Sequence, residues 1–140
     1  MAVEQRILLV DDDSTIRLMY KSLLEAEGYT VVEENCAVEA LNRLAKEEKF
    51  DLVITDIMMA KMDGWEFLKA IRNDVGLSSL ELPVIVVSAH FSSDFLQAEA
   101  FKLGASSTYT KGEPVSRLLK EVKIHTGTMR SKFNDDTSTD

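Results

Sequence analysis

Cysteine is almost absent from this sequence, and so is any long hydrophobic run. Cys36 is the single cysteine, which excludes an internal disulfide and a cysteine-rich zinc site. The first apolar run extends only from Ile7 to Val10 before three aspartates follow. This is too short for the core of an export signal or for a membrane span. We therefore expect a cytoplasmic protein without membrane insertion.

Basic residues are also in the minority. The chain has 24 acidic and 16 basic residues, for a formal net charge of -8. An excess of negative charge opposes binding to DNA or to an anionic membrane. We expect no nucleic-acid partner.

The length and composition are those of one globular domain followed by a tail. With 140 residues, 45% hydrophobic and 29% charged, the chain can bury a core but leaves little room for a second domain. Residues 126–140 are mostly Thr, Ser, Gly, Asn, Asp and charged residues, with almost nothing to bury. We predict a folded domain over residues 1–125 and a mostly disordered C-terminal tail over residues 126–140.

Strand and helix patterns alternate along the folded part. Short apolar runs predict strands at residues 7–10, 30–32, 52–55, 84–87 and 107–110. Four of them are continuous and rich in Val and Ile, which is typical of strands covered on both faces. Apolar residues at helical spacing predict helices around residues 16–24, 37–45, 67–71, 92–103 and 115–122. This order predicts an α/β fold, a doubly wound five-stranded parallel sheet with five helices.

Reactive side chains follow four of the five predicted strands. They are Asp11, Asp12, Asp13, Asp56, Ser88 and Lys111. Each alone has an ordinary explanation, since a run of aspartates is usually a solvated loop or a helix cap. Ligands of open parallel sheets, however, bind beyond the carboxyl ends of the strands. Joint placement at that rim indicates a functional site.

Clustered carboxylates at this rim require a counter-charge. Two carboxylates about 4 Å apart repel by about 4 kcal/mol at an effective dielectric constant of about 20. A few oxygen ligands favour Mg²⁺, which keeps waters that a phosphate can replace. An aspartate beside such an ion can attack phosphorus and form an acyl phosphate. The Lys111 ammonium can neutralise oxygens of the transferred group, and Ser88 can donate to one of them.

At these residues the sequence resembles the receiver domain of two-component response regulators. The resemblance covers roughly residues 5–125. Within the family, the sequence looks most like the stand-alone receivers of the chemotaxis-regulator type. Its matching stretches are ILLVDDD at 7–13, DLVITDIMM at 51–59, MDG at 62–64, VVSA at 86–89, GA at 104–105, and Lys111. It implies a flavodoxin-like sheet with strand order 2-1-3-4-5.

The resemblance also implies how the site is used. Asp56 is expected to accept a phosphoryl group from a phosphohistidine of a sensor histidine kinase or phosphotransfer protein. Mg²⁺ would be bound directly by Asp12 and Asp56, through water by Asp11, and by the backbone carbonyl of Met58. The chain is then expected not to be an enzyme, beyond at most slow self-dephosphorylation.

The phosphorylated state is expected to be read by a downstream protein. Ser88 would be the switch hydroxyl and Lys111 the phosphate-binding lysine. Phosphorylation would alter the surface formed by the fourth helix, fifth strand and fifth helix of what we expect to be a monomer. His90 and Met58 flank the expected approach of the phosphate and are candidates for tuning its hydrolysis, although His90 also reads as an ordinary loop residue.

Three positions depart from the family pattern. Ala60 and Gly112 stand where Pro is usual, and Gly112 predicts a looser loop after the lysine. The aromatic switch position aligns with Thr108, whereas the aromatic Tyr109 lies one residue later. A one-residue register change would be needed to bring Tyr109 into that position, and it would reverse the face of every side chain on the strand.

Two other classes of function fit parts of the sequence. Asp11 and Asp13 have the Asp-x-Asp spacing of haloacid-dehalogenase-like phosphatases, but the short chain and the position of Asp56 oppose that reading. A non-phosphorylated, receiver-like scaffold would explain Thr108 and Gly112, but it has no need for the acids and the lysine.

Overall fold

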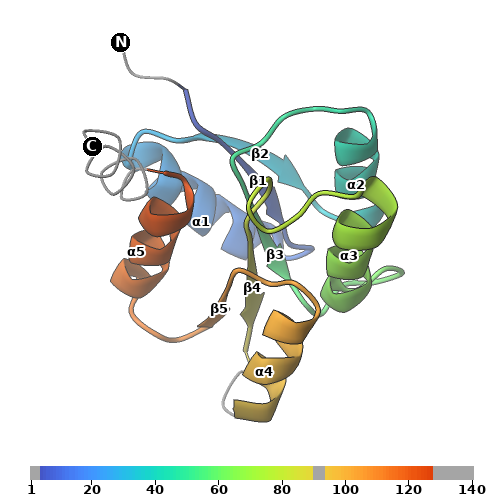
Figure 1. Cartoon of the computed structure of the whole chain (residues 1–140). Coiled ribbons are helices and arrows are strands. Elements are labelled where there is room, and N and C mark those ends of the chain that lie inside the picture. The colour runs from blue at the N-terminus through green and yellow to red at the C-terminus, as the bar shows by residue number, and fades with distance from the viewer. Residues whose placement is uncertain (1–3, 90–93, 128–140) are drawn as a thin grey trace, which may run out of the picture.

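The structure is a computed structural model that describes residues 4–89 and 94–127. Strands and helices alternate along the chain (Figure 1). In order, they are β1 (Arg6–Val10), α1 (Ser14–Ala26), β2 (Thr30–Glu34), α2 (Ala37–Ala45), β3 (Leu52–Asp56), α3 (Gly64–Ala70), the π-helix η1 (Ile71–Val75), β4 (Val84–Ser88), α4 (Asp94–Lys102), β5 (Ser107–Thr110) and α5 (Val115–His125).

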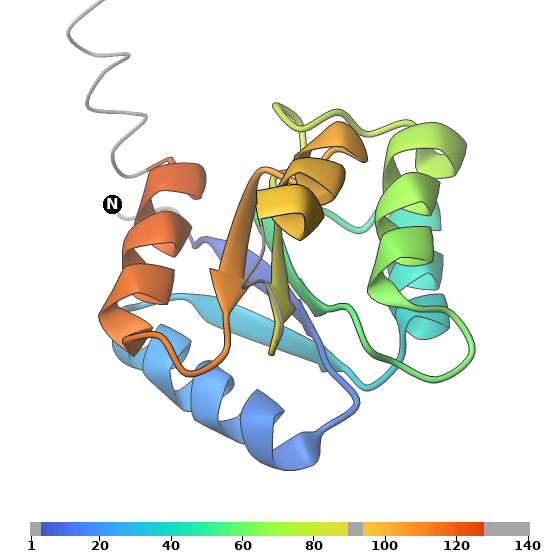
Figure 2. The same cartoon turned by 90° about the horizontal axis from the view of Figure 1, so that it is seen from below.

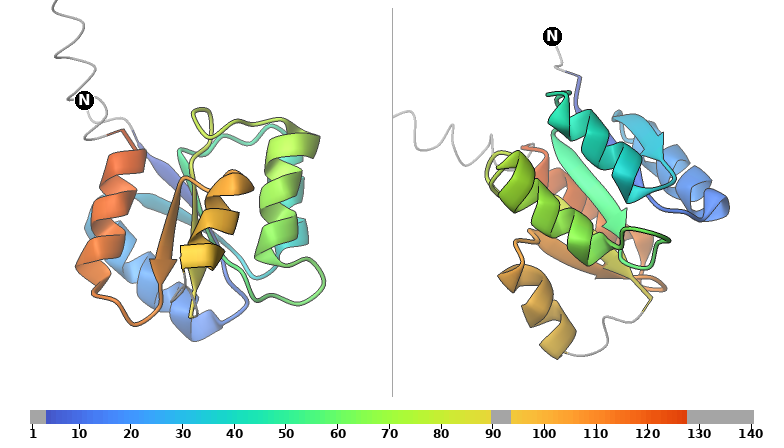
Figure 3. Two further views of the ribbon diagram at one scale, coloured as in Figure 1. Left: turned by 60° about the horizontal axis from the view of Figure 1, so that its bottom comes forward. Right: turned by 90° about the vertical axis from the view of Figure 1, so that its right-hand side faces the viewer.

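The five strands form one parallel sheet in the order β2-β1-β3-β4-β5. This confirms the expected doubly wound, flavodoxin-like fold. Helices α1 and α5 cover one face of the sheet, while α2, α3 and α4 cover the other (Figures 1 and 2). On the second face α2 and α3 lie side by side (Figure 3).

Each face of the sheet carries its own hydrophobic core. The core under α2, α3 and α4 includes Leu8, Val53 and Val86. The core under α1 and α5 includes Leu9, Ile54 and Tyr109. Adjacent strand residues therefore point into different cores, which explains why the central strands read as continuous rather than alternating apolar runs.

Two helix starts stabilise the loops at the carboxyl rim of the sheet. Asp13 caps α1 by accepting hydrogen bonds from the backbone N–H groups of Thr15 and Ile16, at 2.9 and 3.3 Å. Asp63 caps α3 in a reciprocal capping box with Glu66. Both caps fix the direction in which the chain leaves the rim.

The π-helix η1 extends α3 and was not expected from the sequence. Its Arg72 side chain is half-buried and donates to the backbone carbonyls of Leu77, Leu82 and Gly104, at 2.7–3.0 Å. Burial lowers the pKa of Arg72. Arg72 thus joins the segment before β4 to the turn after α4.

Two predicted boundaries, the start of the fourth helix and the start of the C-terminal tail, can be compared with the structure. The predicted fourth helix begins at residue 92, which lies outside the described residues, and α4 is described from Asp94. Thr126, the first residue of the predicted tail, caps α5 and is buried, and its Oγ1 lies 3.0 Å from the Tyr29 hydroxyl oxygen. Residues 128–140 of that tail lie outside the described residues. Among the described helices, none combines the length and apolar character needed to span a bilayer.

Candidate functional site

Three carboxylates meet at the carboxyl rim of the sheet. Asp11 directly follows β1 and Asp56 is the last residue of β3, and these two strands are neighbours. Asp12 is the exposed member of the group, whereas Asp11 and Asp56 are only 2% and 6% exposed. One carboxylate oxygen from each of the three lies within 4.8 Å of the others. The sheet topology has therefore brought together residues that are far apart in the sequence.

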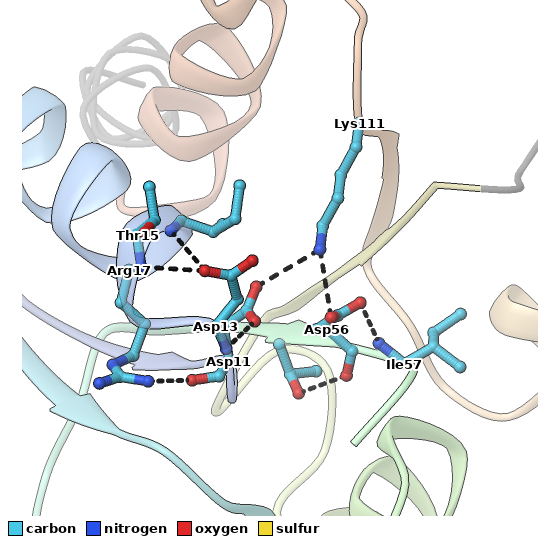
Figure 4. A network of polar contacts seen from close by, with 9 residues as sticks. Asp11, Asp13, Thr15, Arg17, Asp56, Ile57 and Lys111 are labelled. Carbon is cyan, nitrogen blue, oxygen red and sulfur yellow. Dashed lines mark hydrogen bonds and ion pairs between the residues drawn. The ribbon is translucent and has the colours of Figure 1, made fainter. Parts of the chain in front are cut away.

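The carboxylate of Asp56 is held at both oxygens. Oδ1 accepts a hydrogen bond from the backbone N–H of Ile57 at 2.8 Å, and Oδ2 accepts one from Lys111 Nζ at 3.2 Å (Figure 4). The residue therefore points into the acidic cluster rather than away from it. This orientation is the one that the expected chemistry requires.

Lys111, which directly follows β5, supplies positive charge to the site. Its Nζ lies 3.6 Å from Asp11 Oδ2 as well as 3.2 Å from Asp56 Oδ2. Burial alone disfavours the ammonium, but the attraction of Asp11 and Asp56 outweighs it and raises the pKa of Lys111. Lys111 is therefore a stable cation at this site.

The acids still carry more negative charge than Lys111 neutralises. Burial raises the pKa of Asp11 above its ordinary value, and the nearby Asp56 and Asp12 raise it further. The backbone N–H of Asp13, 2.9 Å from Asp11 Oδ1, and the Lys111 ammonium act in the opposite direction without cancelling the rise. Oxygen donors in this arrangement fit a small, hard divalent cation such as Mg²⁺. Met58, the fourth expected ligand, lies two residues after Asp56 and is 72% exposed.

Ser88 and Thr108 lie on the two strands beyond β3. Ser88 ends β4, is buried, and accepts the backbone N–H of Lys111 at its carbonyl at 2.8 Å. Thr108 is buried on β5 and pairs with Val86 of the α2–α3–α4 core. Tyr109 belongs to the opposite core under α1 and α5. Tyr109 and Thr108 therefore face opposite sides of the sheet, an arrangement that opposes the register-change alternative.

Asp13 and His90 are the two remaining residues that the sequence suggested for the site. Asp13 uses one carboxylate oxygen to cap α1, and it is not among the three acids that gather at the rim. His90 lies outside the described residues.

Two residues near the site have functions that the sequence did not reveal. Arg17 of α1 donates to the backbone carbonyl of Asp11 at 2.6 Å and forms an ion pair with Glu33 at 3.3 Å. Gly64 approaches so closely that a Cβ atom there would lie 2.4 Å from the Asp56 carbonyl oxygen. Gly64 stands in a stretch that carried the resemblance, but its close approach to Asp56 depends on the path of the loop.

Comparison with known proteins agrees with this geometry. Residues 7–123 match the family described as the response regulator receiver domain. The transcriptional regulatory protein ZraR of Klebsiella oxytoca is 37% identical over 123 residues, which cover 86% of this chain but only 26% of ZraR. The chain thus corresponds to a small part of that relative's length.

This chain also resembles solved structures of single receiver domains, and the match covers nearly the whole of each. The receiver domain of the Francisella response regulator 1452 has a TM-score of 0.80 at 27% identity, over 90% of this chain and 99% of that one. The chemotaxis protein CheY4 of Vibrio cholerae has a TM-score of 0.76 at 29% identity, over 88% of this chain and 99% of that one.

Proposed function

This chain belongs to the response regulator receiver domain family, and on that premise we propose that it is a signalling switch phosphorylated on Asp56. The observation that carries the proposal is the position of the Asp56 carboxylate. It lies 3.2 Å from Lys111 Nζ and within 4.8 Å of ligand atoms on Asp11 and Asp12. A carboxylate held between a cation and a metal-binding cluster is placed to accept an anionic group.

Asp12 and Asp56 are the proposed direct ligands of Mg²⁺, with Asp11 acting through water and the Met58 carbonyl completing the protein ligands. The exposure of Asp12 leaves the cluster accessible from solvent, while the buried Asp11 and Asp56 form its base. When bound, Mg²⁺ neutralises charge on the oxygens of the transferred phosphoryl group. Lys111 provides the same neutralisation from the protein side.

The phosphoryl donor is a phosphohistidine of a sensor kinase or phosphotransfer protein, or a small acyl phosphate. A carboxylate oxygen of Asp56 bonds to phosphorus while the P–N bond of the phosphohistidine breaks. The bonding electrons leave with the imidazole, which takes up a proton, and Asp56 becomes an acyl phosphate. Lys111 then exchanges its contact with the carboxylate for one with a phosphoryl oxygen.

The phosphorylated form signals through protein contacts. The added negative charge draws the Ser88 hydroxyl towards the phosphoryl group, and the vacated space next to Thr108 changes the surface formed by α4, β5 and α5. Ser88 lies on the strand between Asp56 and Thr108, which supports this order of events. Slow self-dephosphorylation, a monomeric state and a cytoplasmic location remain predictions.

Labelling by acetyl phosphate tests the proposal. We expect the parent, incubated with acetyl phosphate and Mg²⁺, to gain the mass of one phosphoryl group in intact-mass spectra. Asp56→Asn should gain none. Asp51→Asn is the matched control, because Asp51 precedes the opposite end of β3, where it accepts the backbone N–H of Arg6 at 2.8 Å.

A non-phosphorylated scaffold predicts a different result. In that case neither the parent nor the Asp51→Asn control is labelled. The fluorescence of Trp65, the second residue of α3 after the Asp56 loop, also does not respond to Mg²⁺ with beryllium fluoride. Labelling that persists in Asp56→Asn would place the phosphoacceptor elsewhere.

A further inference from the structure

We propose that Tyr109 is a positioning residue for Lys111, acting through a hydrogen bond that fixes the turn after β5. This role rests on the proposed function, because Lys111 matters only if Asp56 receives a phosphoryl group. Tyr109 is 2% exposed, with its ring in the core under α1 and α5. Its hydroxyl donates to the backbone carbonyl of Glu113 at 2.6 Å. The buried ring thus reaches the residue two positions beyond Lys111.

Glu113 closes the turn through further hydrogen bonds. Its backbone N–H donates to the Thr110 carbonyl at 3.1 Å, and its Oε2 accepts the Thr110 N–H at 3.0 Å. Arg117, in the first turn of α5, donates to the same Oε2 at 2.7 Å. Glu113 is therefore held by the core, by the end of β5 and by α5.

The turn requires such a restraint because Gly112 provides none. Gly112 has φ of +100°, in the region that favours glycine, and a Cβ atom there would meet nothing within 4 Å. Glycine restricts the backbone least of all residues. The geometry after Lys111 is thus determined by the hydrogen bonds around Glu113. These hydrogen bonds restrain the turn at the position where Gly112 stands in place of the usual proline.

Lys111 lies between two anchors. On one side its backbone N–H donates to the Ser88 carbonyl at 2.8 Å. On the other side, two residues later, stands the Tyr109–Glu113 hydrogen bond. Together they orient the backbone from which Nζ reaches Asp56 and Asp11. Removing the second anchor leaves Glu113 bonded to Thr110 and Arg117 but detaches it from the core, which weakens the placement of Nζ.

The protonation state of Tyr109 suits a donor. Burial and the nearby Glu113 raise the pKa of Tyr109, and Arg117 only partly opposes them. Burial, together with the neighbouring Tyr109, Asp11 and Asp56, raises the pKa of Tyr20 to about 12. Both hydroxyls therefore keep their protons at neutral pH.

The test compares two tyrosines that each lose only a hydroxyl. Tyr109→Phe is compared with Tyr29→Phe, because Tyr29 lies in the same core and its hydroxyl contacts Thr126 Oγ1 at 3.0 Å. Removing one hydrogen bond changes an equilibrium by roughly 3- to 10-fold. We expect Tyr109→Phe to slow labelling by acetyl phosphate, and to weaken beryllium fluoride binding followed by Trp65 fluorescence, by about that factor. Tyr29→Phe should match the parent, and thermal melting verifies that both variants are folded.

A double-mutant cycle separates positioning from a general structural effect. In a Lys111→Ala background, Tyr109→Phe should cause no further slowing, because the residue it positions has been removed. Equal labelling rates for Tyr109→Phe and the parent would overturn the proposal, as would a full additional loss in the Lys111→Ala background. Absence of labelling in the parent is a separate outcome and contradicts the proposed function itself.

Discussion

At the scale of single residues, the site holds three carboxylates, and the Lys111 ammonium cannot neutralise all of them. Asp11 and Asp56 are buried beside the exposed Asp12, and Lys111 is the cation that contacts them. Burial and its acidic neighbours raise the pKa of Asp11. Ionising Asp11 in the metal-free protein therefore costs free energy that a bound cation removes. The cluster is therefore suited to holding a cation.

The raised pKa of Asp11 predicts a pH-dependent stability difference. A carboxyl whose pKa is higher in the folded state stabilises the fold below its unfolded pKa, with an ordinary value of 3.8, and loses that contribution as pH rises through the folded pKa. Asn at this position does not titrate and makes no such pH-dependent contribution to stability. Without metal, Asp11→Asn should therefore stabilise the protein more at pH 7 than near pH 4, as measured by urea unfolding in EDTA. An equal change at both pH values would contradict the raised pKa.

At the scale of elements, the β3–α3 connection is determined by a close backbone approach. The Gly64 N–H donates to the Ile57 carbonyl at 2.8 Å, and the glycine lies directly against the Asp56 backbone. Alanine usually stabilises a helix relative to glycine. Here a Cβ atom would lie 2.4 Å from the Asp56 carbonyl oxygen, so either α3 or the end of β3 must move.

Gly64→Ala should therefore affect both stability and phosphorylation. We expect a loss of about 1–3 kcal/mol in the free energy of unfolding, as in other overpacked sites, and slower labelling by acetyl phosphate. Gly28→Ala is the control for stability. Gly28 has φ of +97° and open space around it, so alanine costs about 1–2 kcal/mol through the backbone alone. It lies beyond the far end of α1 and should leave labelling unchanged; equal slowing in both variants would show that stability loss, not displacement of Asp56, is the cause.

The π-helix η1 shows how packing overrides local sequence at this scale. Arg72 donates to three backbone carbonyls that no helix satisfies, in segments 5 to 32 residues away along the chain. Gly104 is required beside it, because a Cβ atom there would lie 2.9 Å from the Arg72 side chain and φ is +107°. The wider turn of η1 accompanies this contact, which links α4 to the rest of its face.

At the scale of the whole molecule, Mg²⁺ binding to the Asp11–Asp12–Asp56 cluster should raise global stability. Mg²⁺ bound to the folded state alone stabilises it by mass action, about 1.4 kcal/mol at ten times the dissociation constant. For a domain of this size this is a rise of about 3–6 °C in the melting temperature. Thermal melting with and without Mg²⁺ measures it. Asp12→Asn should abolish most of the rise, while Asp51→Asn, outside the cluster, should keep it; no rise in the parent would contradict a metal site.

The sequence by itself determined the alternation of strands and helices, the parallel sheet and the list of rim residues. It could do so because buried parallel strands require continuous apolar runs and because polar residues directly after them all fall at one rim. Asp56, Lys111 and the Asp11–Asp12 pair were predictable for that reason. A helix cap within the run of aspartates was predictable as well, since capping is local, and the structure assigns it to Asp13.

Only the tertiary structure decided the contacts between segments distant in sequence. Strand periodicity states that Thr108 and Tyr109 point to opposite faces, but not that Tyr109 enters the α1–α5 core and bonds to Glu113. The close approach of Gly64 to Asp56 and the carbonyls gathered by Arg72 likewise depend on loop paths. Such contacts follow from the packing of whole elements, and no local pattern of side chains encodes them.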